Sequence, residues 1–344
     1  MYSSNPPTIV WVANRETLVS DRFISELKVV DGNLVLLNES KLPIWSTNVT
    51  STASLNSAIA VILDDGNLVL RDGLNSFEPI WQSFDHPTNT LLPGAKFNYN
   101  KRTNKSQLLT SWKSTDDPGV GLFSLELHPF RMMVISKWNR SQQYWDTGSW
   151  DSLVIRAYYK YTYQTNENES YFTYYAYNPS TISRFIMNVA GQLQLQIWSA
   201  STKEWNFLSA QPETQCKVYA LCGAFGTCRQ TRLPFCNCLT GFMPRSESEW
   251  NQSDFSGGCV RKSNFVCGRN MEKPDFLMIK VTSLPPNSFV AVKSNGKCRT
   301  TCLNNCSCNA YSFVGNNCSI WDGELLNLSE DNANGKTLYV KAMF

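Results

Sequence analysis

The cysteines are the residues of this chain with the clearest capacity for covalent chemistry. All 12 lie between Cys216 and Cys318, and none lies in the first 215 residues. Such a density is typical of small extracellular domains that need disulfides in place of a large apolar core. Zinc is the alternative, but the spacings are not paired C-x-x-C knuckles, and neither histidine lies in this region. The sequence therefore predicts disulfides, with no metal site and no cofactor.

Residues suited to catalysis are few. The two histidines lie in an Asp-His-Pro turn (His86) and on the polar phase of a predicted strand (His128), so we interpret both as structural. The sequence contains no Gly-rich loop, no His-Arg-Asp and no Asp-Phe-Gly, the signatures of a protein kinase. Asp and Glu are scattered, and no pair stands out as the two carboxylates of a glycosidase. We expect a binding protein rather than an enzyme.

The composition limits which binding partners and which cellular compartment are expected for this chain. The net charge is +3, and Lys and Arg form no long run, so neither nucleic acid nor an anionic membrane surface is expected as a partner. The longest apolar run, Ala58–Leu63, is far short of the roughly 20 residues that a membrane helix needs. Nine N-x-[ST] sequons predict glycosylation and an extracellular location, at Asn38, Asn48, Asn104, Asn139, Asn168, Asn251, Asn305, Asn317 and Asn327.

A repeat organises the first hundred residues. The segments Val30–Leu36 and Asp64–Leu70 repeat one another at an offset of 34, and each places Asp-Gly between aliphatic runs, which predicts a type I′ hairpin. Trp11, Trp45 and Trp81 follow at spacings of 34 and 36. Hairpins repeated at this period build a prism or propeller, and three tryptophans favour a three-sided prism.

The repeat also bears on the beginning of the chain. The turn of the first copy would lie before Met1, so we expect most of one prism side to be missing from this sequence. Met1–Pro7 is polar and is followed by no apolar h-region, so we expect a signal peptide to be absent from this chain. An N-terminally incomplete gene model or splice form would account for both observations, and a genuinely short cytosolic product is the alternative.

Three motifs in this region resemble the bulb-type lectin domain of plant S-domain receptor-like kinases: Trp11–Arg15, the two Asp-Gly-Asn-Leu-Val-Leu turns, and Ile80–Thr88. Lectins of that family bind mannose through Gln-x-Asp-x-Asn-x-Val-x-Tyr, and both copies here are degraded. We favour a role for Asp-Gly-Asn in turn formation over sugar binding. The first copy keeps Asp31, Asn33 and Val35, with Val29 and Leu37 at the Gln and Tyr positions, and the second keeps Asp65, Asn67 and Val69, with Leu63 and Arg71.

The middle of the chain alternates with period two. Tyr159–Tyr163 and Tyr171–Tyr177 flank the polar loop Gln164–Ser170, which predicts a hairpin with one tyrosine-lined face, either structural or partner-binding. The segments Ser111–Ser114 and Asp117–Ser124 resemble the S-locus glycoprotein domain, which implies a second lectin-like β unit.

The cysteine spacings of Cys216–Cys259 are close to those of an EGF-like module, although spacing alone allows fifteen pairings of six cysteines. The last block, Cys298–Cys318, resembles a PAN/apple domain. Calcium is not expected, because a single carboxylate precedes the first cysteine. The resemblance implies the pairs Cys216 to Cys228, Cys222 to Cys236, Cys238 to Cys259, Cys298 to Cys318 and Cys302 to Cys308, which leaves Cys267 and Cys306.

We therefore expect a mainly β chain of tandem β-prism lectin-like domains followed by a disulfide-rich EGF-like module and a small PAN/apple α+β domain. The expected domains are 1–100 (bulb-type lectin, N-terminal part missing), 101–211 (S-locus glycoprotein), 212–262 (EGF-like) and 263–344 (PAN/apple).

The resemblance implies the extracellular, plasma-membrane-associated recognition region of a receptor-like kinase, or a secreted S-locus-glycoprotein-like protein. Its expected partner is a protein or peptide, with small cysteine-rich proteins and recognition of pollen among the family roles, and with homodimerisation as a further interaction. A mannose-binding lectin is the alternative, with carbohydrate as the partner.

Overall fold

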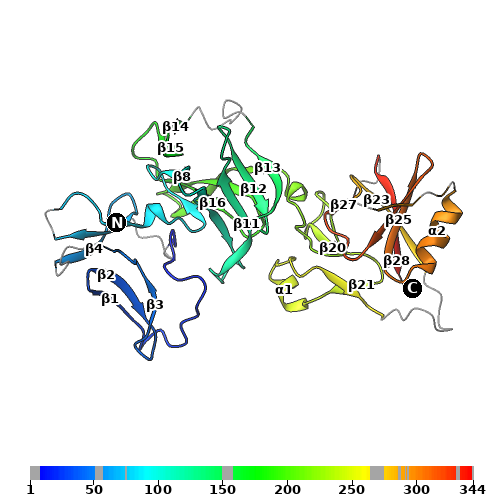
Figure 1. Ribbon diagram of the computed structural model, residues 1–344, viewed down its shortest axis with the longest axis horizontal. Helices are drawn as coiled ribbons and strands as arrows, with labels where there is room; N and C mark the ends of the chain where they lie inside the picture. Colours follow the sequence, from blue (N-terminus) through cyan, green and yellow to red (C-terminus); the bar gives the residue numbers. More distant parts are fainter. Residues whose placement is uncertain are drawn as a thin grey trace. The chain divides into compact units, whose positions relative to one another are not determined.

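A computed structural model describes residues 8–50, 57–73, 76–148, 158–263, 275–285, 288–290, 292, 294–330 and 334–342. They form a mainly β protein, as predicted (Figure 1). The chain divides into two compact units, Met1–Glu213 and Thr214–Phe344. The division lies just before the first cysteine, so the first unit must be held by its apolar core and the second contains all the disulfides.

The first unit begins with two antiparallel three-stranded sheets. A short 3-10 helix, η1 (Ser83–Asp85), follows the second sheet. The sheets consist of β1 (Glu26–Val30), β2 (Asn33–Leu37) and β3 (Pro43–Ser46), and of β4 (Ala58–Ile62), β5 (Leu68–Asp72) and β6 (Trp81–Gln82).

The three repeated tryptophans meet in one cluster. The ring centroids of Trp11, Trp45 and Trp81 lie 5.6 to 5.9 Å apart, and each pair of rings is packed edge to face. Trp45 and Trp81 come from the two sheets, whereas Trp11 lies in an extended segment that forms no strand. The indole nitrogen of Trp11 donates to the carbonyl of His86 (2.8 Å), and the His86 ring stacks on Trp81. The threefold arrangement predicted from the spacing is thus present at the centre of this prism.

The two Asp-Gly turns differ in type. Asp31 and Gly32 both have positive φ, 47° and 74°, as the predicted type I′ turn requires. In the second copy Gly66 donates its N–H to the carbonyl of Leu63, and within the turn only Gly66 has positive φ. This geometry is a type I turn followed by a left-handed glycine, so the type I′ prediction is wrong for the second copy, because Asp64 lengthens the loop.

The rest of the first unit contains three four-stranded antiparallel sheets, in the orders β10-β11-β12-β13, β14-β15-β8-β9 and β18-β17-β16-β7. Strand β11 of the first sheet contacts β8 of the second and β16 of the third, so the three sheets pack against one another and form a unit that we call the second prism. Its strands are β7 (Thr90–Leu91), β8 (Phe97–Asn100), β9 (Lys105–Ser106), β10 (Leu109–Trp112), β11 (Val120–Leu127), β12 (Val134–Trp138), β13 (Gln142–Asp146), β14 (Tyr159–Thr165), β15 (Glu169–Ala176), β16 (Ser183–Met187), β17 (Leu193–Ser199) and β18 (Glu204–Gln211).

Arg15 connects two of the motifs that carry the family resemblance. Its half-buried guanidinium donates to the backbone carbonyls of Pro118 (2.7 Å), Ser111 (2.7 Å) and Gly119 (3.1 Å). Burial lowers the pKa of Arg15, but the three carbonyls satisfy its donors. The end of the first tryptophan motif is therefore anchored on the second prism.

The larger buried cluster of the second unit joins the segment predicted as EGF-like to the segment predicted as PAN/apple. Strand β19 pairs in parallel with β27, and Phe242 and Cys259 of the first segment pack in the same buried cluster as Trp321 and Val340 of the second. A second buried cluster surrounds the cysteines of α2. Its helices are η4 (Gln215–Lys217), α1 (Glu247–Asn251) and α2 (Asn295–Asn304), and its strands are β19 (Gly226–Cys228), β20 (Cys236–Cys238), β21 (Phe242–Pro244), β22 (Cys259–Arg261), β23 (Asp275–Val281), β24 (Ser288–Val290), β25 (Cys308–Val314), β26 (Asn317–Asp322), β27 (Leu328–Ser329) and β28 (Lys336–Ala342).

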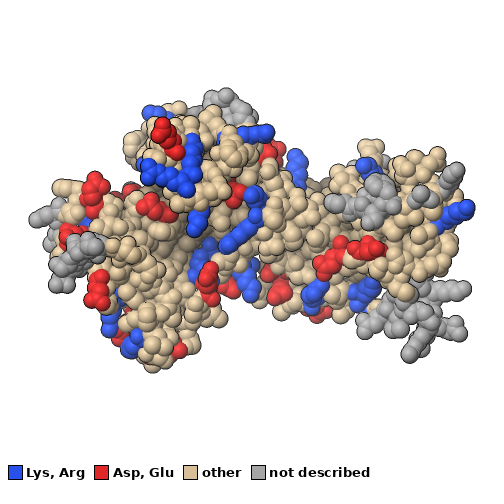
Figure 2. Space-filling model, viewed as in Figure 1, with Lys and Arg blue, Asp and Glu red and all other residues tan. Residues whose placement is uncertain are grey.

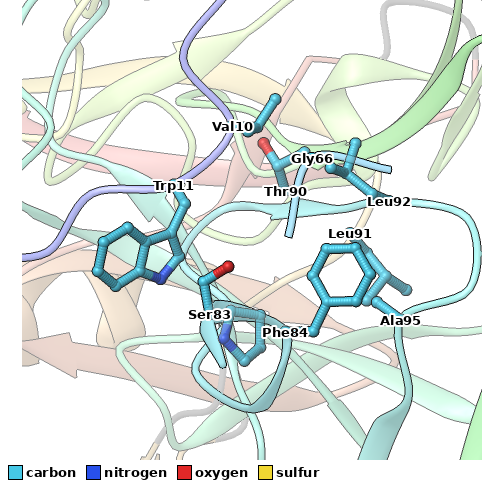
Figure 3. A pocket seen from close by; sticks show the side chains of 10 residues that line it. Val10, Trp11, Gly66, Ser83, Phe84, Thr90, Leu91, Leu92 and Ala95 are labelled. Atoms are coloured by element: carbon cyan, nitrogen blue, oxygen red, sulfur yellow. The ribbon is translucent and has the colours of Figure 1, made fainter. Parts of the chain in front are cut away.

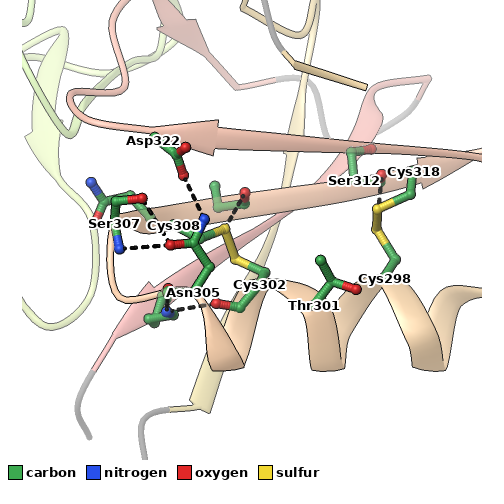
Figure 4. Close-up of a disulfide and its surroundings, with 12 residues drawn as sticks. Cys298, Thr301, Cys302, Asn305, Ser307, Cys308, Ser312, Cys318 and Asp322 are labelled. Carbon is green, nitrogen blue, oxygen red and sulfur yellow. Dashed lines mark hydrogen bonds between the residues drawn. A yellow bond between two sulfur atoms is a disulfide. The ribbon is translucent and has the colours of Figure 1, made fainter. Parts of the chain in front are cut away.

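The disulfides tie short elements to this core. The structure contains five of the pairs that the resemblance implies, and two of them fasten α2 to β25 and β26 (Figure 4). Cys306 is also disulfide-bonded, whereas Cys267 lies outside the described residues. The five pairs are Cys216 with Cys228, Cys222 with Cys236, Cys238 with Cys259, Cys298 with Cys318 and Cys302 with Cys308.

Candidate functional site

The first copy of the mannose motif lies on the β1–β2 hairpin. The Asn33 side-chain oxygen accepts hydrogen bonds from the Thr47 hydroxyl (2.9 Å) and from the Val49 backbone N–H (2.6 Å). Asp31 is exposed in the turn, and Val35 is buried. Asn33 therefore joins its hairpin to the segment that follows β3, which is a structural use of the amide.

The second copy shows the same use more completely. Asn67 is 5% exposed, and its Nδ2 donates to Gln82 Oε1 (2.9 Å), while its Oδ1 accepts from the Ser83 hydroxyl (3.1 Å) and the Phe84 N–H (3.2 Å). The Asp65 carboxylate in turn accepts from the Asn67 N–H (2.9 Å). The oxygen of Asn67 is saturated by protein donors, which leaves it no lone pair for a sugar hydroxyl.

Apart from Arg71, the remaining motif positions are apolar and cannot hydrogen-bond a sugar. Val69 is buried, Val29 is exposed, and Leu37 and Leu63 are half-buried apolar side chains. Arg71 occupies the Tyr position of the second copy, and its guanidinium contacts the carbonyl of Ser76 at 3.4 Å. The structure thus places the two sets of motif residues on separate sheets and joins them into no common polar pocket.

A small cavity lies beside the second copy (Figure 3). Trp11, Ser83, Phe84 and Leu92 line it, and its volume is about 20 Å³. This space is of the order of one water molecule and is far too small for a sugar ring. A Cβ on Gly66, which also lines the cavity, would come within 2.7 Å of Leu92 Cδ1, so the packing here needs glycine.

The predicted tyrosine hairpin is present as β14 and β15, but its tyrosines occupy both faces. The register pairs Tyr161 with Tyr174 and Tyr163 with Phe172, so Tyr161 and Tyr163 share a face with even-numbered residues of β15. Residues 166–168 form the loop, which is shorter than predicted. The prediction of one tyrosine-lined face is therefore wrong, because the loop length fixes the register and separates the two odd-numbered series.

The inner face of this hairpin is part of the core. Tyr159 and Tyr174 are fully buried, and the Tyr174 hydroxyl donates to the Leu91 carbonyl (2.9 Å). Burial raises the pKa of Tyr174 well above its ordinary value, so it remains a neutral donor.

The outer face carries exposed tyrosines. Tyr158, Tyr175 and Tyr177 are 59%, 50% and 63% exposed, and Tyr177 donates its N–H to the Tyr158 carbonyl (3.1 Å). Tyr175 lies in β15, and Tyr158 and Tyr177 lie directly beyond the paired ends Tyr159 and Ala176. If the alternation continues by one residue, these three side chains, which we call the outer tyrosine patch, lie on the same side of the hairpin. Tyr175 and Tyr177 were predicted to share a face with Tyr159 and Tyr161, whereas they lie on the opposite face of the hairpin.

A groove that sequence analysis missed lies over the β16–β18 sheet. Its volume is about 1050 Å³, and its lining includes Arg184, Gln194, Gln196, Trp198 and Trp205. The period-two series Gln194, Gln196 and Trp198 on β17 was the available signal, because it places amides and an indole on one face of a central strand.

Two features are absent from the described residues, a cluster of metal-binding side chains and a membrane-spanning helix. No group of three or more His, Cys, Asp or Glu side chains within them could hold a metal ion. Across the same ranges, no helix is both long and apolar enough to cross a membrane. Charged side chains of both signs are interspersed on the visible face (Figure 2).

The predicted glycosylation sites are mostly accessible. Asn38 and Asn305 are half-buried, and Asn305 Oδ1 accepts from the Ser307 N–H (3.0 Å). The exposed sites are Asn48, Asn104, Asn139, Asn168, Asn251, Asn317 and Asn327.

Family models match three parts of the chain. Residues 8–113 match the D-mannose binding lectin family, residues 145–246 the S-locus glycoprotein domain and residues 267–328 the PAN-like domain. Their order is the one that the sequence resemblance implied.

Relatives cover nearly the whole chain. A G-type lectin S-receptor-like serine/threonine-protein kinase of Arabidopsis thaliana is 41% identical over 99% of the chain and 43% of its own length. An S-locus-specific glycoprotein of Brassica oleracea is 34% identical over 97% of the chain and 80% of its own length. The chain thus spans about two fifths of the length of the receptor-like kinases it matches. On this coverage, and on the three domains found in order, the chain belongs to the family of G-type lectin S-receptor-like kinases and S-locus glycoproteins.

Proposed function

We propose that this chain is an extracellular ligand-recognition region, of a receptor-like kinase or of a secreted S-locus-glycoprotein-like protein, and that its ligand is a protein or peptide. The observation that carries the proposal is the internal use of Asn33 and Asn67. The amides that would recognise mannose instead hold the first prism together, so recognition falls to other surfaces.

The outer tyrosine patch is the surface that we assign to the ligand. Tyrosine is enriched at protein interfaces because its ring buries a large area at low entropic cost while its hydroxyl remains able to hydrogen-bond. Tyr158, Tyr175 and Tyr177 stand on a paired hairpin with a buried inner face, so they are held on a rigid support. Small cysteine-rich proteins, including those of pollen recognition, are the ligand class that we favour, and homodimerisation is a further interaction of the same chain.

The disulfides and the exposed sequons support the extracellular location. Disulfides persist in oxidising compartments, and glycans require accessible asparagines. The role that we propose for these residues is binding, and the relatives named as serine/threonine-protein kinases extend well beyond the part that the chain matches.

Binding of mannose by the first prism is the second candidate. The match of residues 8–113 to the D-mannose binding lectin family favours it. The two proposed functions differ in the class of ligand, protein or mannose. They also differ in the surface whose mutation should abolish binding, which is the outer tyrosine patch for a protein and the first prism for mannose.

A library of secreted cysteine-rich proteins, displayed and selected on the full chain, tests the proposal. We expect selected binders to lose at least tenfold in affinity for the triple variant Tyr158→Ala/Tyr175→Ala/Tyr177→Ala, because such anchors each contribute about 1–2 kcal/mol or more. Phe130→Ala is the matched control, since Phe130 is an 88% exposed aromatic outside the patch. Binders that ignore the triple variant, or mannose oligosaccharides that bind the chain with a specific affinity, would contradict the proposal.

A further inference from the structure

The groove over the β16–β18 sheet is built from side chains rather than from backbone. Strand β17 pairs with β16 on one side and with β18 on the other, so its backbone groups are engaged in the sheet. The groove floor therefore offers a ligand amides, indoles and a guanidinium. An extended peptide usually binds a free strand edge through backbone hydrogen bonds, which the middle of this sheet cannot supply.

A directional chain of hydrogen bonds crosses the floor. Arg184 Nε donates to Gln196 Oε1 (2.9 Å), and Gln196 Nε2 donates to Gln194 Oε1 (3.1 Å). Each amide oxygen thus accepts one hydrogen bond, and no described residue accepts from Gln194 Nε2 or from the terminal nitrogens of Arg184. These N–H groups are available to a ligand rich in acceptors, and the hydroxyl groups of a sugar can also donate to the second lone pair of each amide oxygen.

Arg184 adds a positive charge to a lining that also contains Lys203 and Glu204, so that two cations stand against one carboxylate there. Its guanidinium lies 4.3 Å from the centre of the Trp205 ring, and within the described ranges no carboxylate forms an ion pair with it. Burial lowers the pKa of Arg184 to about 10, which still leaves it charged at neutral pH. A half-buried cation without a counter-ion favours an anionic ligand, and a guanidinium binds carboxylates with two parallel hydrogen bonds.

Aromatic faces line the same space. Trp198 and Trp205 pack edge to face with centroids 5.5 Å apart, and the Trp205 indole nitrogen is fixed by a hydrogen bond to the Thr8 hydroxyl (2.8 Å). Trp112 lines the groove as well. Indole faces present a flat apolar surface of negative potential, against which the C–H groups of a sugar ring can stack.

We infer that this groove binds an acidic oligosaccharide, whose ring carboxylates pair with Arg184 and whose ring faces stack on the tryptophans. The volume of about 1050 Å³ is enough for several sugar rings. The site is separate from the degenerate mannose motif and from the outer tyrosine patch, so the inference goes beyond the proposed function. It adds a second ligand class to a chain whose first ligand is a protein.

Calorimetric titration of the full chain with an α-1,4-linked hexamer of galacturonic acid tests the inference. We expect binding that weakens with added salt, because the contact with Arg184 is ionic. Arg184→Gln should weaken it at least tenfold. Gln194→Glu, which replaces the available donor by a carboxylate, should weaken it similarly without disturbing the buried core. Arg102→Gln removes an exposed charge outside the groove and should leave the affinity unchanged.

The probes also separate the alternatives. Absence of binding to the hexamer would overturn the inference, as would equal loss in Arg102→Gln, which would indicate nonspecific charge attraction. Binding of a hexaglutamate peptide in place of the sugar would assign the groove to acidic peptides instead. Binding of neutral mannohexaose with the same affinity would show that Arg184 does not select for an acidic ligand, and would overturn the inference. The triple tyrosine variant should bind the hexamer with unchanged affinity. This test therefore does not depend on whether the outer tyrosine patch binds a protein ligand.

Discussion

At the scale of single residues, one asparagine can serve either a ligand or the fold, and its neighbours decide which. Asn67 is surrounded by Gln82, Ser83 and Phe84, which supply partners for both ends of its amide. A buried amide with all its partners stabilises the hairpin, and a buried amide that loses them is costly. In this copy of the Asp-Gly-Asn motif, the asparagine therefore stabilises the hairpin and its contact with η1.

Asn67→Ala should lower the free energy of unfolding of the first prism by about 1–3 kcal/mol, because it leaves the Ser83 hydroxyl and the Phe84 N–H without their acceptor. Asn67→Asp keeps the oxygen and should cost less if the remaining carboxylate is accommodated. Chemical denaturation of the full chain measures the loss, with the exposed Glu78→Ala as control. An unchanged stability combined with loss of mannose binding would favour the lectin reading instead.

The sequence could indicate the role of such residues only in part. The turn role of Asp31 follows from local turn chemistry, and the structure agrees with it. The groove residues could not be assembled in the same way, because Arg184 and Trp205 are brought together by strand pairing across 20 residues of sequence. Local patterns give the conformation of a turn, whereas a binding groove depends on long-range register.

At the scale of elements, β1 is an edge strand held partly by charge. Glu26 receives hydrogen bonds from Lys28 and from Lys41, and these lower its pKa to about 2 from an ordinary value of 4.5. A carboxylate with a lowered pKa stabilises the folded state above its unfolded pKa, and this contribution is lost as the pH falls through the folded pKa.

The first prism should therefore lose a small part of its stability between about pH 4.5 and pH 2. Because Glu26 lies at the surface, solvent screening keeps the effect modest. Urea unfolding at several pH values measures it, and Glu26→Gln should show a weaker pH dependence within this window. The same slope in both proteins would assign the acid sensitivity to other carboxyl groups.

Helix α2 depends on a buried lysine as well as on its two disulfides. Lys341 is 2% exposed, and its ammonium donates to the carbonyls of Cys302 (2.8 Å) and Asn305 (2.9 Å) at the C-terminal end of the helix. Burial lowers the pKa of Lys341, but the free carbonyls and the negative end of the helix dipole favour the charge.

Lys341→Met should cost about 1–3 kcal/mol, because it removes the ammonium that donates to both carbonyls and leaves Asn305 with only the Cys308 N–H as a donor. Hydrogen exchange should become faster in α2 and remain unchanged in the first unit. Lys336→Met is the control, since Lys336 is exposed on the same strand, β28. Equal protection of α2 in both variants would show that the disulfides alone hold the helix.

At the scale of the whole molecule, the sequence predicted the repeating architecture better than the pairing within it. The tryptophan spacing predicted the threefold cluster, because equivalent residues of three repeats around one axis point toward that axis. The pairing of the tyrosines across the hairpin was not predicted, because side chains alternate along each strand in the same way whichever residues of the neighbouring strand they face. The shared core of residues 214–344 was missed because cysteine spacing suggests separate modules, whereas burial of Phe242 against Trp321 depends on contacts distant in sequence.

This shared core constrains the order of events during synthesis. The EGF-like residues emerge from the ribosome before the PAN-like residues that complete their apolar cluster, including Trp321 and Val340. Their cysteines can therefore pair while most of the surrounding packing does not yet exist. We expect the disulfide between Cys238 and Cys259, rather than apolar contacts, to hold this segment together during that interval.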